Sequence, residues 1–164
     1  MPARKKMTDP KYRGIEKKEI PVVQRNGVKV KVLSGKIDGT VGPVGDLSID
    51  IEYFDVELVS GKIFEYATPQ NRTVFAYVVS GSIEVQDKTI KSGFCAVFSE
   101  GDLVRIGSKK GARFLFVMGE PLKEPVAWRG PIVMNTQEEL NQAFEELDEG
   151  TFIKTVKPTK SFRR

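Results

Sequence analysis

Few side chains in this sequence could carry out acid–base, nucleophilic or metal chemistry. The 164 residues contain no histidine and one cysteine, Cys95. Without an imidazole, the chain can form neither a Ser-His-Asp nor a Cys-His nucleophile pair, and it has no histidine to bind a metal. A single cysteine also excludes an internal disulfide and any zinc or iron–sulfur site built from several cysteines. We therefore expect no catalytic residue, no metal site and no cofactor.

Carboxylates are the remaining candidates for metal ligands. A Ca²⁺ or Mg²⁺ site needs several oxygens that converge on one point, and no D-x-D-x-D-G spacing occurs here. The acidic residues on segments that we expect to be strands are Glu52, Asp55, Glu57, Glu65 and Glu84. Because they alternate with apolar residues, we expect their side chains to point outward from an apolar inner face.

Cys95 lies in the apolar segment Phe94-Cys-Ala-Val-Phe98. A buried cysteine behaves as a small hydrophobic residue, and its thiol pKa rises in apolar surroundings. Nothing in the sequence supplies an imidazole to activate the thiol. We expect Cys95 to be part of the core.

The segment from Ile20 onward predicts many short strands. Asn26-Gly27 joins two apolar runs and is typical of a tight hairpin. The apolar alternation changes phase at Tyr53-Phe54, which predicts a bend or bulge there. Short strands with a turn signal every few residues indicate an antiparallel sandwich or barrel over residues 20–134.

Small barrels are either filled by side chains or hold one small ligand. An aromatic-filled core is one interpretation of this sequence, and a ligand pocket is the other. The candidate pocket-lining residues are Tyr66, Phe75, Tyr77 and Phe98.

One segment has the period of a helix. Residues 135–149 place Leu140 and Phe144 on one face, while Thr136 and Glu139 form a capping box. Gly150 is suited to end the helix. We expect an amphipathic helix that covers one end or face of the barrel.

Trp128 and Arg129 precede this helix in the chain, and their side chains are typical of interface hot spots. The alternative is that Trp128 packs on the barrel and Gly130-Pro131 turns the chain. The candidate interface residues are Trp128, Arg129, Leu140 and Phe144.

Charge is concentrated at both ends of the chain. Residues 1–18 hold seven basic and two acidic residues, a net charge of +5, and residues 154–164 hold five basic residues and no acid. The overall net charge is +4, so the body between the ends is acidic, at −6. Basic ends can bind nucleic acid, can be solvated, or can dock on the acidic body. We expect docking or solvation, with nucleic-acid binding as the less favoured alternative.

No apolar run is long enough to span a membrane. The first residues, Met1-Pro-Ala-Arg-Lys-Lys, lack the apolar stretch of a secretory signal. We therefore expect a soluble cytoplasmic protein without membrane contact.

Three segments resemble the pirin family of the cupin superfamily. The longest is Gly119–Phe144, which is similar to the closing region of pirins. Phe75-Ala-Tyr-Val-Val-Ser-Gly81 resembles a cupin core strand. Pro2–Tyr12, followed by Glu19-Ile-Pro21, resembles the linker that precedes the second pirin domain. The resemblance covers residues 2–154, approximately the whole chain.

Pirins consist of two tandem cupin barrels, and this chain resembles the C-terminal one. The resemblance implies that iron is bound in the N-terminal barrel, by three histidines and a glutamate that this sequence does not carry. Metal-bearing cupins place a His-x-His pair before the core strand, where this chain has Ala67 and Pro69. The resemblance therefore implies a metal-free, cupin-type double-stranded β-barrel with a C-terminal helix.

We expect this domain to act as an assembly or regulatory module, either as a homodimer or with a separately encoded cupin domain. The expected organisation is a basic arm at 1–19, a barrel at 20–134, a helix at 135–149 and a basic tail at 150–164. The competing hypothesis is a degenerate or metal-independent cupin enzyme related to quercetin dioxygenases.

Overall fold

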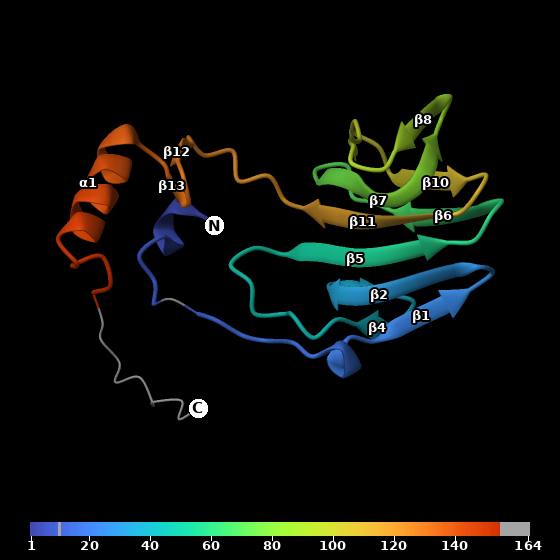
Figure 1. Cartoon of the computed structure of the whole chain (residues 1–164), viewed down its shortest axis with the longest axis horizontal. Helices are drawn as coiled ribbons and strands as arrows, with labels where there is room; N and C mark the ends of the chain where they lie inside the picture. The colour runs from blue at the N-terminus through green and yellow to red at the C-terminus, as the bar shows by residue number, and fades with distance from the viewer. Residues whose placement is uncertain (10, 155–164) are drawn as a thin grey trace. The chain divides into compact units, whose positions relative to one another are not determined.

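The computed structural model describes residues 1–9 and 11–154, and it contains two compact units (Figure 1). The larger unit is Arg13–Pro121, and the smaller one combines Met1–Tyr12 with the chain from Leu122 onward. Most of the C-terminal basic tail, residues 155–164, lies outside the described residues. Among the described residues, no helix is long and apolar enough to cross a membrane.

The larger unit is a curled antiparallel sheet. Its hydrogen-bonded order is β1-β2-β5-β11-β7-β10-β6, and β8 and β9 pair with β7 outside this path. Its strands are β1 (Val22–Arg25), β2 (Val28–Ser34), β5 (Ile51–Leu58), β6 (Lys62–Ala67), β7 (Thr73–Val85), β8 (Lys88–Lys91), β9 (Cys95–Val97), β10 (Leu103–Ser108) and β11 (Ala112–Gly119). Two small strands, β3 (Lys36–Ile37) and β4 (Thr40–Val41), form a separate hairpin, and a short 3₁₀ turn occupies Lys17–Glu19.

The long strand β7 makes the sheet curl. Its first part pairs with β11 and its last part with β8, and the register with β11 shifts between Arg113 and Phe114. At the bend, Gly81 has φ +73°, and a Cβ there would lie 2.4 Å from the carbonyl oxygen of Gly111. Only glycine fits such a close backbone approach. The expected all-β barrel is therefore confirmed.

The predicted hairpin occurs, but the bend or bulge predicted within the strand at Tyr53-Phe54 does not. Asn26 and Gly27 both have positive φ between β1 and β2. A register shift lies between Val32 and Ser34, opposite Phe54 and Tyr53. This shift lies in β2, so the inward and outward side chains of β5 alternate without interruption. Tyr53 therefore lies on the outer side of the sheet with its partner Val117.

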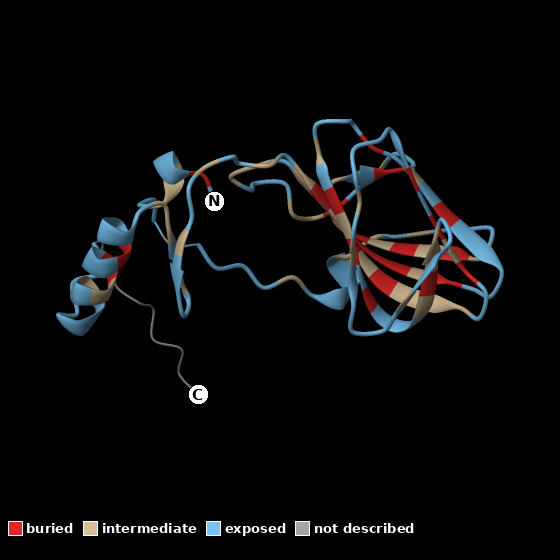
Figure 2. Cartoon of the chain, turned by 90° about the horizontal axis from the view of Figure 1, so that it is seen from above, coloured by how far each residue is buried: buried red, intermediate tan, exposed pale blue. Residues whose placement is uncertain are grey.

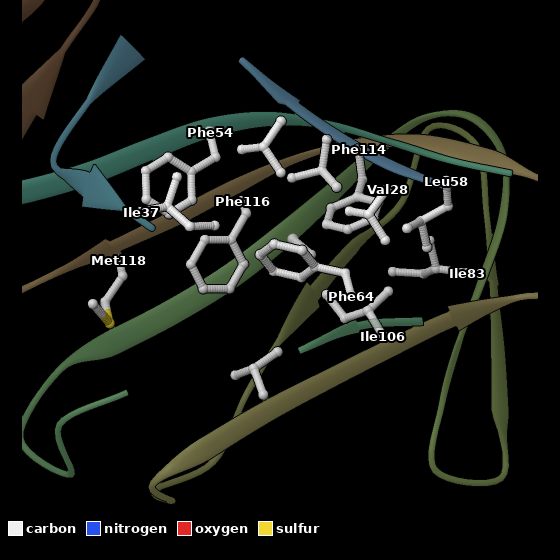
Figure 3. Close-up of a cluster of buried hydrophobic side chains, with 14 of the residues drawn as sticks. Val28, Ile37, Phe54, Leu58, Phe64, Ile83, Ile106, Phe114, Phe116 and Met118 are labelled. Carbon is white, nitrogen blue, oxygen red and sulfur yellow. The ribbon is translucent and has the colours of Figure 1, made fainter. Parts of the chain in front are cut away.

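The core lies inside the curl of this sheet, where buried residues of facing strands meet (Figures 2 and 3). Alternate positions of β2, β5, β7, β10 and β11 point inward. The side chains that are completely buried include Val32, Phe54, Val56, Phe64, Val78, Ile83, Ile106, Phe114 and Phe116.

The smaller unit is built around one helix. The helix α1 (Gln137–Asp148) begins at the predicted capping box of Thr136 and Glu139. It packs against the hairpin of β12 (Ala127–Arg129) and β13 (Ile132–Met134) and buries Leu140 and Ala143. The hairpin therefore belongs to the helical unit, and the barrel unit ends at Pro121 instead of residue 134.

The first residues of the chain belong to the same unit. Pro2 is buried, and Ala3–Lys5 form a 3₁₀ turn. The backbone N–H of Ala3 donates to a Glu124 carboxylate oxygen at 2.8 Å, and Lys6 donates to the carbonyl oxygen of Val133. The beginning of the basic arm is thus docked on the chain itself.

Candidate functional site

The inner face of the barrel is filled by aromatic rings. Tyr66 lies against Phe54, Phe64 and Phe116, and the ring centroids in this cluster are 5.3–6.0 Å apart. Figure 3 shows how Phe54, Phe64 and Phe116 meet. Edge-to-face and offset ring pairs of this kind stabilise a core beyond the area that they bury. This region of the barrel is therefore packed by side chains.

One carboxylate faces this interior. Glu52 pairs in register with Met118, a buried residue, so it shares the inner side of β5 with Phe54. Burial raises the pKa of Glu52, although the neighbouring Tyr66 hydroxyl lowers it in part. Its Oε2 atom is buried without a hydrogen-bond partner. The expectation that Glu52 points outward is wrong, because β5 keeps the alternation of Phe54 and Val56, which places Glu52 on the inner side.

Burial also raises the pKa of the Tyr66 hydroxyl, and the neighbouring Glu52 carboxylate adds to this shift. The hydroxyl donates to the carbonyl oxygen of Lys36 at 2.9 Å. Tyr66 therefore stays protonated in the neutral pH range and acts as a hydrogen-bond donor rather than as a base.

The side chains of the barrel do not suit a metal of the kind that cupins bind. The sequence has no histidine. Within residues 1–9 and 11–154, no three residues among Asp, Glu and Cys come close enough to hold an ion. Among the described residues, Glu52 is the carboxylate that we find on the inner face. The two oxygens of one carboxylate are too few donors to hold an iron ion.

The outer face of the sheet carries a buried charge network. Asp55 is 7% exposed and receives two hydrogen bonds from Arg113, at 2.8 Å and 2.7 Å. Lys31 adds a third contact at 3.2 Å. The hydrogen bonds from Arg113, followed by those from Lys31, hold the pKa of Asp55 below its ordinary value. These three side chains tie β2, β5 and β11 together.

Beside this network, the outer face becomes apolar. We define the outer apolar face by six residues that point to the outer side of the sheet: Phe75, Tyr77 and Val79 of β7, Leu115 and Val117 of β11, and Val97 of β9, which pairs with Phe75. Tyr77 is 41% exposed and Val97 is 73% exposed. Exposed contiguous apolar surface of this kind marks interaction sites in soluble domains.

The surface of the barrel unit includes a smaller and a larger groove. One has a volume of about 250 Å³ and lies at the end of the outer apolar face, between Ile51, Phe75 and Val117. The other has a volume of about 570 Å³ and is rimmed by Lys62, Arg105 and Lys109.

The cations at the larger groove are largely paired with acids. Lys109 contacts Glu84 at 3.4 Å, and Arg105 contacts Glu65 at 3.1 Å. Since these charges are neutralised within the protein, the groove has little capacity to attract an anion.

The four candidate pocket residues do not line one pocket. Tyr66 packs in the aromatic interior, and Phe98 packs partly against the core beside the larger groove. Phe75 and Tyr77 alternate with the buried Ala76 and therefore point to the outer face.

The four candidate interface residues lie in the smaller unit. Trp128 is 73% exposed and donates to the carbonyl oxygen of Gly130 at 2.7 Å. The Arg129 guanidinium lies 3.8 Å from the centre of the Phe144 ring, in a cation–π contact. Leu140 is 1% exposed, so it contributes to packing within this unit and is unavailable to a partner.

Cys95 is exposed, so the expected core position is wrong. The reason is its place on β9, which pairs only with β7 among the described strands. Cys95 pairs with Tyr77, an outward residue, and therefore faces outward as well. Sequence reasoning missed this position because five consecutive apolar residues do not indicate which side chains of the strand point inward and which point outward.

The comparisons with known proteins agree on one family. The family model of the pirin C-terminal cupin domain matches residues 53–153. A pirin-like protein of Caulobacter vibrioides is 41% identical over 154 residues, which cover 93% of this chain and 56% of that protein. Human pirin is 36% identical over 144 residues, which cover 84% of this chain and 49% of that protein.

A solved structure matches most of the chain as well. A quercetin 2,3-dioxygenase from Acinetobacter baumannii matches with a TM-score of 0.86 and 29% identity, over 93% of this chain and 54% of that one. The chain thus spans about half the length of the relatives it matches.

Proposed function

Because this chain belongs to the pirin family of cupins, we propose that it works as an assembly module, which binds a second cupin barrel through its outer apolar face. The observation that carries this proposal is the exposure of that face. Tyr77, Val79 and Val97 are 41%, 37% and 73% exposed on a sheet whose inner face is closely packed. Apolar side chains on a rigid sheet lose little conformational freedom on binding and gain from leaving water.

The nature of the partner rests on the relatives. Those that match are about twice as long, and the matching family model describes a C-terminal cupin domain. In such proteins this domain is accompanied by further chain, so a second cupin barrel is the partner class that we favour. It could be another copy of this chain or a cupin domain supplied separately.

Sedimentation of the full chain at micromolar concentration tests this proposal, alone and mixed with the purified N-terminal half of a pirin relative. We expect a complex in at least one of the two samples. Tyr77→Lys should weaken it, because a charge would be placed within the apolar contact. Val59→Lys is the matched control, because Val59 is also exposed, at 60%, but lies in the turn after β5. A monomer in both samples would overturn the proposal.

A dioxygenase is the second candidate function, and the likeness to a quercetin 2,3-dioxygenase structure favours it. Its requirement is a metal site that the described residues do not provide. Metal analysis of the purified chain, combined with a quercetin turnover assay, separates the two candidates. Stoichiometric iron with turnover would favour the enzyme, and their joint absence would favour assembly.

A further inference from the structure

The strand β9 is an open edge of the barrel sheet. Among the described strands it pairs only with β7. The carbonyl oxygen of Phe94 and the N–H of Phe98 bond to β7 at 3.0 Å each. Because the hydrogen-bonding direction alternates along a strand, the N–H and C=O groups of Cys95 and Val97 point to the open side.

This edge lacks the protection that the other edges have. Natural edge strands carry charges, prolines or bulges that prevent pairing with another chain. β1 ends in Arg25, β6 contains Lys62 and Glu65, and β8 contains Lys88 and Lys91. In contrast, residues 94–98 contain neither a charge nor a proline, although Phe94 and Val97 are 67% and 73% exposed.

The sequence of this edge is nearly the same in both directions, Phe-Cys-Ala-Val-Phe. Two-fold symmetry requires a surface that is complementary to itself, and an antiparallel pairing centred on Ala96 meets this requirement. Phe94 would lie opposite Phe98 of the second copy, and Cys95 opposite Val97. A partner of different sequence would not need such symmetry.

We infer that β9 pairs antiparallel with β9 of a second copy of this chain, with Ala96 opposite Ala96. The inference rests on the proposed assembly function and specifies the partner and the strand through which it binds. We call this pairing of β9 with β9 the seam. In this register Cys95 and Val97 of facing strands form hydrogen-bonded pairs, so every open polar group of the two residues finds a partner. The alternative registers leave some of these groups unpaired.

The same register extends the outer apolar face across the two-fold axis. Cys95 pairs with Tyr77 and Val97 pairs with Phe75 within one copy, and all four point to the outer side. The dimer would therefore place the two outer apolar faces side by side on one continuous sheet, and Cys95 and Val97 of facing strands would add apolar contact at the seam to the backbone hydrogen bonds.

A charge on the seam tests the inference. Val97→Lys should weaken dimerisation about tenfold or more, because the change enters a two-fold interface twice and places like charges beside each other. Val59→Lys, at a position that is also exposed but away from the seam, should dimerise like the unchanged chain. Thermal unfolding of each variant shows that the barrel is intact, as expected for exposed positions.

Disulfide trapping tests the register itself. Val97→Cys places a second thiol opposite Cys95 of the other copy, at a Cα separation of about 5.5 Å that a disulfide can span. Air oxidation with copper–phenanthroline should give a covalent dimer that is reversed by reductant. The unchanged chain and the double variant Cys95→Ala/Val97→Cys each lack one thiol of the pair and should remain uncross-linked.

The outcomes distinguish the seam from the assembly function. A dimer that is unaffected by Val97→Lys and is not trapped by Val97→Cys would overturn the seam but leave the assembly function in place. A chain that is always monomeric alone but binds a separate cupin domain would likewise overturn only the second-copy inference. Equal cross-linking in the single-thiol controls would indicate random collision and would also overturn the register.

Discussion

Arg113 holds Asp55 with two hydrogen bonds, from Nε to Oδ1 at 2.8 Å and from Nη2 to Oδ2 at 2.7 Å. The two residues lie on neighbouring strands, β11 and β5, on the outer side of the barrel sheet. This bidentate pair leaves the Asp55 side chain almost buried while 44% of the Arg113 side chain is exposed. The nearly buried carboxylate therefore depends on the guanidinium for its hydrogen bonds. Removing the guanidinium is the most direct way to weaken the sheet without changing its core.

Arg113→Met should destabilise the fold by about 1–3 kcal/mol, because a nearly buried carboxylate would lose its main partner. Chemical denaturation at neutral pH measures the loss. Arg105→Met is the matched control, because the Arg105–Glu65 pair is exposed on both sides and should contribute less than about 1 kcal/mol. Equal losses in the two variants would show that Asp55 is not effectively buried.

The Asp55–Arg113 pair should also make stability depend on pH in the acid range. The folded pKa of Asp55 lies below that of the unfolded chain, about 3.9. Its stabilisation is therefore complete above about pH 5 and is lost as the pH falls through the folded pKa. Asp55→Asn should flatten this acid limb of the stability curve in denaturation experiments at successive pH values. An unchanged limb would assign the acid sensitivity to other carboxylates.

Glu52→Gln should have the opposite pH signature. Burial raises the pKa of Glu52, so its ionised form destabilises the fold above the unfolded pKa of about 4.3, and the effect is full above the folded pKa. The neutral amide should raise stability at pH 7 by up to about 1 kcal/mol and change little at pH 3, where glutamate is protonated. Thermal unfolding at the two pH values measures this difference. A loss of stability at pH 7 would mean that the ionised carboxylate has a favourable partner.

Gly81→Ala should cost more than about 2 kcal/mol, because the added Cβ would lie 2.4 Å from the carbonyl oxygen of Gly111 and φ is +73°. Gly93→Ala isolates the backbone term, since Gly93 has φ +86° but open space around a Cβ, and should cost about 1 kcal/mol. Urea denaturation of both variants gives the comparison. Similar costs would mean that the bend in β7 tolerates a small opening.

Cys95 should react with a thiol reagent in the native protein at low concentration, because its side chain is exposed. At concentrations at which the proposed dimer forms, the reaction should slow, since Val97 of the second copy would lie beside the thiol. Labelling that is quenched at successive times and followed by mass spectrometry records the reaction rates at both protein concentrations. A reaction that requires denaturant even at high dilution would contradict the exposed position of Cys95.

Local patterns in the sequence were sufficient for several elements. The turn at Asn26-Gly27 depends on the backbone freedom of those two residues, and the start of α1 depends on Thr136 and Glu139, residues that are close in sequence. The segments that resemble pirins led to the family that the comparisons support. Missing histidine is likewise a property of composition and needs no structure.

The positions that sequence reasoning misplaced depend on contacts between distant strands. Alternation indicates that Phe75 and Ala76 face opposite sides, but which side is inner depends on the pairing of β7 with β11. Glu52 faces inward because its strand extends to pair with Met118, and Cys95 is exposed because β9 lies at an edge.

By itself, then, the sequence determined which elements this chain contains: an all-β barrel of the pirin family, without any imidazole side chain, and a capped helix. Only the tertiary structure decided which side chains are left at the surface. The physical reason is that turns and caps form from neighbouring residues, whereas burial and edge position are set by strand pairings between residues far apart in the chain. The exposed Val97 and the nearly buried Asp55 are both consequences of such pairings.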